Sequence, residues 1–181
     1  AAACHALGFT LDQIVRGLES LRFVPGRLER VPGAVDFIVL VDYAHKPDAL
    51  GSVLETLRAI PQLKRLIVVF GCGGDRDPGK RPIMGEIATR LADWAVLTTD
   101  NPRSEDPQAI IDAIEAGAKK DGRANYICHR DRFEAIEWAI RQARAGDCVI
   151  VAGKGHETYQ IFKDKTVDFD DREVCRKALI F

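Results

Sequence analysis

The chain has 181 residues, of which 46% are hydrophobic and 29% are charged, and its formal net charge is −1. This composition is ordinary for a globular domain, and it argues against a nucleic-acid-binding protein, which needs clustered excess Lys and Arg. No apolar run approaches the roughly 20 residues that span a bilayer, and the first residues lack the pattern of a secretory signal, so we expect a cytoplasmic protein without membrane contact.

The N-terminal 22 residues predict one or two helices, because apolar residues recur there at helical spacing. They are Leu11, Ile14, Val15, Leu18 and Leu21. Pro25 and Gly26 end this pattern, and we interpret residues 25–33 as a junction. Such a helix has no partner of its own, so we expect residues 1–24 to be the tail of a preceding domain and residues 34–181 to form the domain that follows.

After the junction, apolar runs alternate with amphipathic segments. The runs predict strands at 37–41, 66–70, 94–98, 125–128 and 148–152. Helices are expected to begin at Pro47, Arg81, Pro107 and Arg132, and a terminal hairpin is expected around residues 163–165. Asp170 or Asp171 is expected to cap a last helix. This order predicts an α/β fold: a doubly wound, Rossmann-like, mostly parallel sheet with helices on both faces and a C-terminal hairpin.

Several loops that follow predicted strands are rich in charged and hydrogen-bonding residues. They cover residues 42–48, 71–81, 99–103 and 153–157. Because the carboxyl ends of parallel strands meet at one edge, and ligands of open α/β sheets bind there, we expect a binding site at this edge.

The most informative loop is Asp100-Asn101-Pro102-Arg103. A guanidinium and an amide on a proline-stiffened turn form a clamp for a carboxylate, although the same residues also suit a turn with a surface Arg. Arg76 is a second candidate carboxylate binder, and its alternative is an ion pair with a neighbouring Asp. Glu157 is a candidate partner for an ammonium group. Two cations and one anion together suit an amino acid, which carries both signs.

Other residues of these loops have less specific patterns. Gly153 lets the backbone approach a ligand closely, and His156 is more readily explained as structural than as a proton carrier. Asp42 suits either a ribose hydroxyl or a turn hydrogen bond, and the two readings are equal from the residues alone. Tyr43 could pack on a base, and Arg27, in the junction, could reach a ligand held between two domains.

Two nucleotide motifs are incomplete. Residues 74–80 match G-x-x-x-x-G-K, but position 81 is Arg where a phosphate loop needs Ser or Thr. The G-x-G-x-x-G fingerprint of dinucleotide binding is also missing. The five cysteines form no C-x-x-C pair, so we expect reduced, buried thiols and no zinc site. Cys72, in a glycine-rich loop near Arg76, could be accessible with a lowered pKa.

Five motifs, in order along nearly the whole chain, resemble the Mur ligases of peptidoglycan synthesis, and most closely the branch that adds meso-diaminopimelate. They are Pro25-Gly26-Arg27, residues 42–48, residues 71–77, Asp100-Asn101-Pro102-Arg103 and residues 153–157. The resemblance implies a monomeric, three-domain, cytoplasmic ligase that uses ATP and Mg²⁺, acts through an acyl phosphate, and serves cell-wall biogenesis, cell shape and cell division. The acceptor would be UDP-N-acetylmuramoyl-L-alanyl-D-glutamate.

The resemblance also implies residue roles, carried over by motif. The far amino-acid end of meso-diaminopimelate would contact Arg76, Asp100, Asn101, Pro102, Arg103, Gly153 and Glu157. The nucleotide would lie toward Arg27, Asp42, Tyr43 and His45. The family's G-T-x-G-K-T phosphate loop, modified lysine and UDP-sugar domain are absent and would precede Ala1, so residues 1–24 would end the central ATPase domain. We therefore expect no catalytic or metal-binding residue in this chain and no turnover by it alone. The alternative is a stand-alone small-molecule binding module of the same fold.

Overall fold

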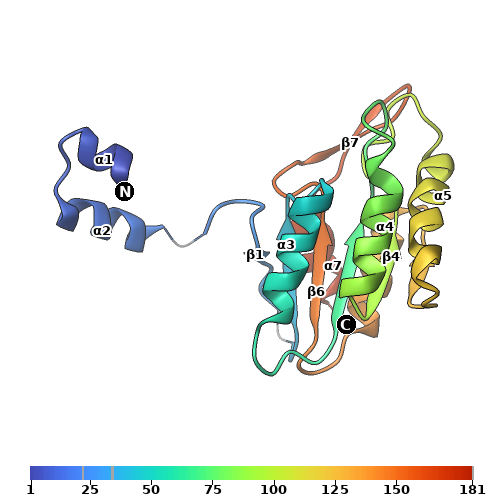
Figure 1. The fold of residues 1–181 in the computed structure, drawn as a ribbon, viewed down its shortest axis with the longest axis horizontal. Helices are drawn as coiled ribbons and strands as arrows, with labels where there is room; N and C mark the ends of the chain where they lie inside the picture. The colour runs from blue at the N-terminus through green and yellow to red at the C-terminus, as the bar shows by residue number, and fades with distance from the viewer. Residues whose placement is uncertain (22, 34, 181) are drawn as a thin grey trace.

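The structure is a computed structural model that describes residues 1–21, 23–33 and 35–180. Its first two helices, α1 (Ala2–Ala6) and α2 (Leu11–Ser20), lie apart from the rest of the chain (Figure 1). Helix α2 begins at a capping box, in which Thr10 and Gln13 each bond to the other's backbone N–H. The predicted N-terminal helices are thus confirmed, and they leave an apolar stripe uncovered, with Leu11 68% and Leu18 58% exposed.

The remaining chain is built on one main sheet. Within the described residues, its six strands have the order β1-β2-β6-β3-β4-β5. Four of the five strand pairings are parallel, and the fifth, between β1 and β2 at one edge of the sheet, is antiparallel. The strands are β1 (Glu29–Arg30), β2 (Ile38–Asp42), β3 (Leu66–Phe70), β4 (Trp94–Leu97), β5 (Tyr126–Cys128) and β6 (Cys148–Ala152).

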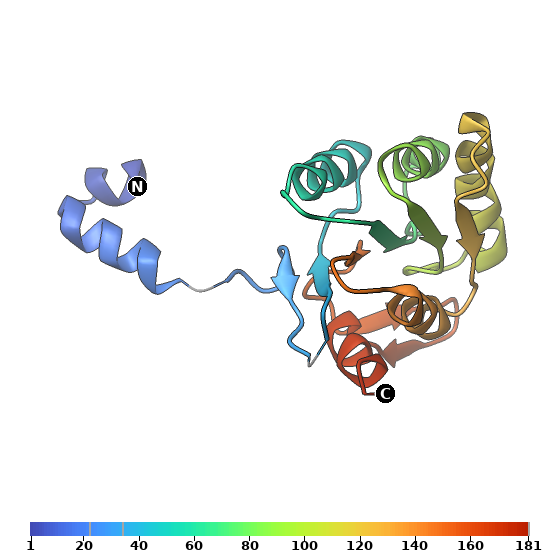
Figure 2. The same cartoon turned by 90° about the horizontal axis from the view of Figure 1, so that it is seen from below.

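Helices cover both faces of this sheet, as Figure 2 shows. One face carries α3 (Pro47–Arg58), α4 (Lys80–Leu91) and α5 (Pro107–Ala118), after which a short 3₁₀ turn, η1, spans Lys119–Asp121. The other face carries α6 (Arg132–Gln142) and α7 (Asp171–Ala178). A separate hairpin of β7 (Tyr159–Ile161) and β8 (Thr166–Asp168) confirms the one predicted from the sequence. Over the part of the chain that is described, no helix is long and apolar enough to cross a membrane.

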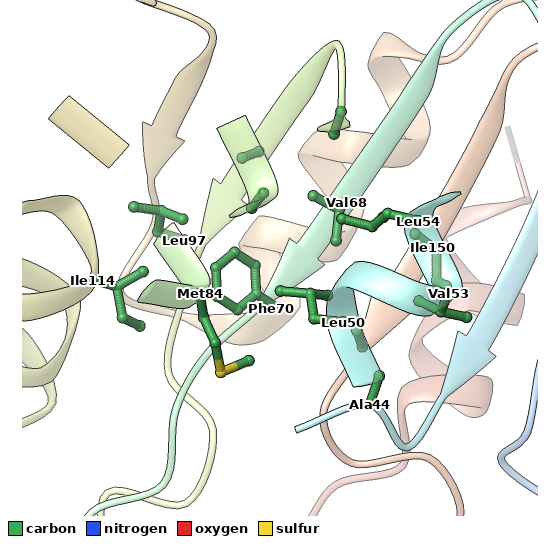
Figure 3. Packing of buried hydrophobic residues seen from close by; sticks show 14 of the residues in the cluster. Ala44, Leu50, Val53, Leu54, Val68, Phe70, Met84, Leu97, Ile114 and Ile150 are labelled. Atoms are coloured by element: carbon green, nitrogen blue, oxygen red, sulfur yellow. The ribbon is translucent and has the colours of Figure 1, made fainter. Parts of the chain in front are cut away.

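The apolar strands are buried because each packs against helices on both sides. Every residue of β3 and of β6 is buried. Figure 3 shows one of the two core clusters, in which Phe70 of β3 lies with Met84 of α4 and Leu50 of α3. The second cluster joins the other face of the sheet to α6 and α7. This two-sided burial confirms the doubly wound α/β fold that the continuous apolar runs predicted.

Two local features differ from the sequence-based expectation or refine it. The junction at 25–33 contains the edge strand β1, and Val31 beside it is only 4% exposed and joins the second core cluster. A two-residue strand is too short to leave a periodic signal in the sequence. Of the two candidate caps of α7, Asp170 accepts from the Arg172 backbone N–H, whereas Asp171 is fully buried.

Asp171 instead forms a buried ion pair with Arg132. The guanidinium donates to both carboxylate oxygens at 2.8 Å, and both side chains are 0% exposed. Arg132 also donates to the carbonyl oxygens of Thr99 and Ala152, at 3.3 and 3.1 Å. These carbonyls lie at the carboxyl ends of β4 and β6, so one side chain joins α6, α7 and two strand ends.

We predict that Arg132→Met destabilises the fold by about 3–5 kcal/mol, because it leaves the Asp171 carboxylate buried without a counter-charge. Urea unfolding measures the change. The matched control is Arg176→Met, which removes an exposed ion pair with Glu173 and is expected to change stability little. The double variant Arg132→Met/Asp171→Leu is expected to recover part of the loss; equal effects of Arg132→Met and the control would contradict this account.

Candidate functional site

A cavity of about 750 Å³ opens at the carboxyl edge of the parallel strands. Loops after β2, β3, β4 and β6 form its walls, which places the four predicted loops together. Strand β6 lies between β2 and β3, and the helices that follow β2 and β3 lie on the opposite face from α6, which leads into β6 (Figure 2). The cavity therefore lies at a switch point of the topology, where open α/β sheets bind ligands.

Most of the predicted site residues line this cavity. They are Tyr43, His45, Arg76, Asp100, Asn101, Arg103, Gly153 and Glu157. Pro102 instead lines a neighbouring cavity of about 780 Å³, which lies under the hairpin and shares Arg103 with the first. Arg27 and Asp42 line neither of these two cavities.

Asp42 has a well-defined structural role. One carboxylate oxygen accepts from the Leu28 backbone N–H and the other from that of Ala44, both at 2.8 Å. The side chain thus ties the junction and the turn before α3 to the end of β2. Of the two roles that the sequence suggested equally for Asp42, a turn hydrogen bond and a contact with a ribose hydroxyl, the structure shows the turn hydrogen bond.

Arg103 is held by backbone carbonyls. The Arg103 backbone adopts a left-handed φ of 52°. The side-chain Nη1 donates to the backbone oxygens of Gly74 and Asn101, at 2.8 and 3.4 Å. A Cβ at position 73 would lie 2.9 Å from that Nη1, so glycine there gives the guanidinium its room. No hydrogen bond within the described residues uses Nε or Nη2 of Arg103, so these two donors remain for a ligand.

The loops of Arg76 and Arg103 are interlocked. The Gly74 backbone N–H donates to the Asn101 oxygen at 2.9 Å, and a Cβ at position 74 would lie 1.9 Å from the Pro102 oxygen. Asp75, also with a left-handed φ of 53°, accepts from the Ser104 hydroxyl at 2.6 Å. The two residues with left-handed backbone, Asp75 and Arg103, therefore lie in the two loops that these contacts join, and strained backbone of this kind clusters at binding sites.

Arg76 is exposed and extends along the cavity wall. Its Nη1 donates to the Asp75 backbone oxygen at 2.9 Å rather than to an Asp carboxylate. Below it, the buried Arg81 donates to Glu105 at 2.8 Å, and this hydrogen bond holds the pKa of Glu105 below its ordinary value. Glu105 also accepts from the Asp75 N–H, so this ion pair braces the loop that carries Arg76.

Lys154 is a site residue that the sequence reasoning missed. It is 0% exposed, and its Nζ donates to Asn101 Oδ1 at 3.1 Å and to Glu157 Oε2 at 3.3 Å. Asn101 Nδ2 donates to the same Glu157 oxygen at 2.9 Å. Burial lowers the pKa of the Lys154 ammonium, while Asp100 and Glu157 act against that shift. The sequence feature that could have identified Lys154 is its place between two glycines, directly after a buried strand.

The hairpin holds the Asp100–Arg103 loop in place. Gln160 donates to the Asp100 oxygen at 2.9 Å, and Ile161 N donates to Asn101 Oδ1 at 3.0 Å. The Arg103 backbone N–H in turn donates to the Ile161 oxygen at 3.0 Å. Sequence reasoning also missed Gln160, because its contact depends on a chain reversal 60 residues away in sequence.

The predicted nucleotide-facing residues form a cluster around Tyr43. The Arg27 guanidinium lies 4.9 Å from the Tyr43 ring, and the rings of His45 and His156 lie 4.6 and 5.2 Å from it. An aromatic ring with a guanidinium beside it suits a base and its phosphates. The close approach of Gly26 to Gly155, where a Cβ would lie 2.4 Å from a backbone carbon, brings Arg27 to this place.

The loop that partly matches a phosphate loop uses its N–H groups internally. Gly79 N donates to Asp77 Oδ1 at 2.8 Å, and Arg81 N donates to the Pro78 oxygen at 3.2 Å. The Gly74 and Asp75 N–H groups are also engaged, so these four donors already have partners within the protein. Lys80 donates to the His45 oxygen at 2.8 Å and so ties this loop to the loop before α3.

The expectation of buried thiols is confirmed for Cys72, Cys148 and Cys175 and is wrong for Cys4 and Cys128. Cys72 is 2% exposed, and burial raises its pKa to about 12, so it is not a reactive thiol; its neighbours' positive charges are weaker than the loss of solvation. Cys4 and Cys128, expected to be buried, are exposed. Cys128 ends β5, an edge strand, where the apolar run does not imply cover on both faces.

A doubly wound α/β sheet with a charged cavity at its switch point belongs to the class of small-ligand-binding domains. The family described as "Mur ligase, glutamate ligase domain" matches residues 26–155. The chain belongs to the Mur ligase family and corresponds to its C-terminal domain.

Individual relatives are informative about the branch of the family. The chain is 50% identical over 179 residues to the UDP-N-acetylmuramoyl-L-alanyl-D-glutamate–2,6-diaminopimelate ligase of Geobacillus kaustophilus, covering 99% of this chain and 36% of that enzyme. A solved structure of such a ligase matches with a TM-score of 0.79 and 42% identity, over 98% of this chain and 36% of that one.

A more distant structure supports the fold alone. The UDP-N-acetylmuramate–alanine ligase of Thermotoga maritima matches with a TM-score of 0.69 at 19% identity, over 98% of this chain and 34% of that one. The chain spans about 36% of the length of two Geobacillus diaminopimelate ligases that it matches.

We predict that thiol reactivity follows burial. At pH 8, iodoacetamide is expected to alkylate Cys4 quickly and Cys128 slowly, because the Cys128 sulfur is partly desolvated by its neighbours and its pKa is raised to about 11. Cys72, Cys148 and Cys175 are expected to stay unmodified until the chain is unfolded in urea, because a thiol whose pKa lies far above the pH carries almost no thiolate. Peptide mass spectrometry measures each site; early modification of Cys72 would restore its candidacy as a reactive residue.

Proposed function

We propose that this chain is the amino-acid-binding C-terminal domain of an ATP-dependent ligase. The whole enzyme would add meso-diaminopimelate to UDP-N-acetylmuramoyl-L-alanyl-D-glutamate in peptidoglycan synthesis. The observation that carries this proposal is one cavity lined by two guanidinium groups, Arg76 and Arg103, and by the Glu157 carboxylate. The high identity to diaminopimelate ligases supports the choice of substrate.

The charge pattern of the cavity matches the far end of meso-diaminopimelate, which has a carboxylate and an ammonium group. The carboxylate would bind Arg76, Asn101 and Arg103, and the ammonium would bind Glu157, with Asp100, Pro102 and Gly153 shaping the site. Lysine has no carboxylate at that end. It would leave the guanidinium donors without a partner, so the site would disfavour it.

In the proposed reaction, the D-glutamate carboxylate of the acceptor becomes an acyl phosphate at the expense of ATP. The other amine of the bound diamino acid then attacks the acyl carbon, an amide bond forms and phosphate leaves. Holding the amine in place lowers the entropy cost of this encounter. The domain's own contribution is therefore to bind, orient and select the nucleophile.

ATP and Mg²⁺ belong to the proposed reaction in different ways. The cluster of Arg27, Tyr43 and His45 fits a nucleotide, and it would contact one held by another domain, with Asp42 keeping that cluster in place. For magnesium the residues do not fit: the described part of the chain has no group of three or more His, Cys, Asp or Glu side chains that could hold a metal. We assign no metal ligand to this chain.

We further propose that residues 1–24 are the end of the central ATPase domain, 25–33 the junction and 34–181 the C-terminal domain of a monomeric cytoplasmic enzyme. The exposed apolar stripe of α2 supports this division, because water-exposed stripes of this kind mark a surface that another part of the protein covers. A stand-alone binding module is the second candidate, and it would be expected to bury the stripe. Without the ATPase phosphate loop, this chain by itself is expected to be inactive.

We predict that Arg103→Ala in the full-length ligase lowers kcat/KM for meso-diaminopimelate by about 100-fold or more, because a charge-assisted pair with the substrate carboxylate is lost. The measurement is steady-state release of phosphate with UDP-N-acetylmuramoyl-L-alanyl-D-glutamate and ATP. Arg141→Ala, which removes an exposed arginine on α6, is the control. Unchanged kinetics in Arg103→Ala would reject the clamp.

Calorimetric titration of the full-length enzyme, with nucleotide and UDP-sugar peptide present, tests ligand choice directly. We expect heat of binding from meso-diaminopimelate and at least about tenfold weaker binding of lysine. Arg76→Lys is expected to weaken diaminopimelate binding, because an ammonium cannot reproduce the two parallel donors of a guanidinium. Equal affinity for the two amino acids would contradict the proposed specificity.

A further inference from the structure

We propose that Lys154 is a positioning residue for amino-acid recognition: it sets the orientation of the Asn101 amide and the Glu157 carboxylate, so that both present their free hydrogen-bonding groups to the ligand. The inference rests on the proposed function and deepens it. Lys154 does not line the cavity, so it acts through the two residues that do.

The first step concerns the Asn101 amide. Its Oδ1 accepts from two donors, Lys154 Nζ at 3.1 Å and Ile161 N at 3.0 Å. Rotating the amide by 180° would direct its NH₂ group against these donors, and no acceptor would be there. The amide therefore keeps Nδ2 on the cavity side, where one hydrogen bonds to Glu157 and the second is available to a carboxylate.

The second step concerns Glu157. Its Oε2 accepts from both Asn101 Nδ2 and Lys154 Nζ. No hydrogen bond within the described residues uses Oε1, which is thus available to a ligand ammonium. Because Lys154 contacts both side chains, it places a donor for a carboxylate and an acceptor for an ammonium side by side.

The third step concerns the cost of burying Lys154. A fully buried ammonium is unfavourable unless it is paired and hydrogen-bonded. Here Asp100 and Glu157 supply opposite charge, and the Tyr159 ring lies 5.6 Å from Nζ. If Lys154 served only to balance the charges of Asp100 and Glu157, its ammonium would not need a hydrogen bond to the Asn101 amide oxygen. The contact with Asn101 Oδ1 is what a positioning role needs, since it determines the direction of a group that the ligand contacts.

The positioning role has a consequence for selectivity. Asn101 Nδ2 faces the carboxylate that meso-diaminopimelate has and lysine lacks at this end. Loss of Lys154 would leave Ile161 N as the one donor to Asn101 Oδ1 within the described residues. The rotated amide, whose carbonyl oxygen would face the substrate carboxylate and repel it, would then be populated more often. The loss should therefore weaken diaminopimelate binding more than lysine binding.

The test is a double-mutant cycle in the full-length ligase. Lys154→Met removes the charge and donors at similar length; it is expected to raise KM for meso-diaminopimelate about tenfold while kcat stays within about threefold. In an Asn101→Ala background the same change should raise KM only about threefold, the share that acts through Glu157. Lys163→Met, the same change at an exposed hairpin position, is the control and should match the wild type.

Several results would overturn the inference. They are an unchanged KM in Lys154→Met, equal effects of Lys154→Met in both backgrounds, or a loss of kcat and thermal stability at constant KM. Each result is compared with the wild-type ligase, which must add diaminopimelate for the test to apply. A wild type that does not add it would reject the proposed function, whereas an active wild type with one of these results would reject the positioning role alone.

A second variant keeps the test decisive if Lys154→Met does not fold. Asn101→Asp retains an acceptor for Lys154 and Ile161 N, but it replaces the cavity-facing donor by an oxygen. This variant also loses the hydrogen bond from Nδ2 to Glu157, so some loss of melting temperature is expected. With the amide oriented as proposed, it raises KM for meso-diaminopimelate at least about tenfold and changes KM for lysine less. A variant that binds diaminopimelate normally would show that the substrate does not meet Nδ2, and would reject the positioning role.

Discussion

The site depends on the buried ion pair between Arg132 and Asp171. Through its other hydrogen bonds, the Arg132 guanidinium holds the carbonyl groups of Thr99 and Ala152, which end two strands that are not neighbours in the sheet. The loops that begin there carry Asn101 and Arg103 on one side and Lys154 and Glu157 on the other. One interaction on the far side of the sheet therefore sets the distance between the two halves of the cavity.

The residues that line the cavity use some of their hydrogen-bonding atoms on contacts within the protein and keep the others for a ligand. Arg103 uses Nη1 on backbone carbonyls, and Asn101 uses Oδ1 on Lys154 and the hairpin. Contacts of this kind reduce the conformational freedom that a ligand would otherwise have to remove on binding. Left-handed backbone at Asp75 and Arg103 is the local cost of this arrangement.

Much of the fold followed from the sequence because its signals are local. Continuous apolar runs at 66–70 and 148–152 predicted buried parallel strands, and Pro47 and Pro107 marked helix starts that the structure has at the same residues. The short strand β1 and the exposure of Cys128 were not predicted, since both depend on what lies across space. The position of the loops at one edge was predictable, because parallel strands leave no other arrangement.

By itself, the sequence determined the order of strands and helices, the loops that carry the ligand-contacting residues and the resemblance to the Mur ligases. Only the tertiary structure decided which atoms of those residues face the cavity. The roles of Lys154, Gln160 and Asp171 rest on contacts between residues that are distant in the chain, as with the 60 positions between Gln160 and Asp100. Hydrogen bonds have short range and strict direction, so a sequence pattern names the groups that could meet, and packing selects the pairs that do.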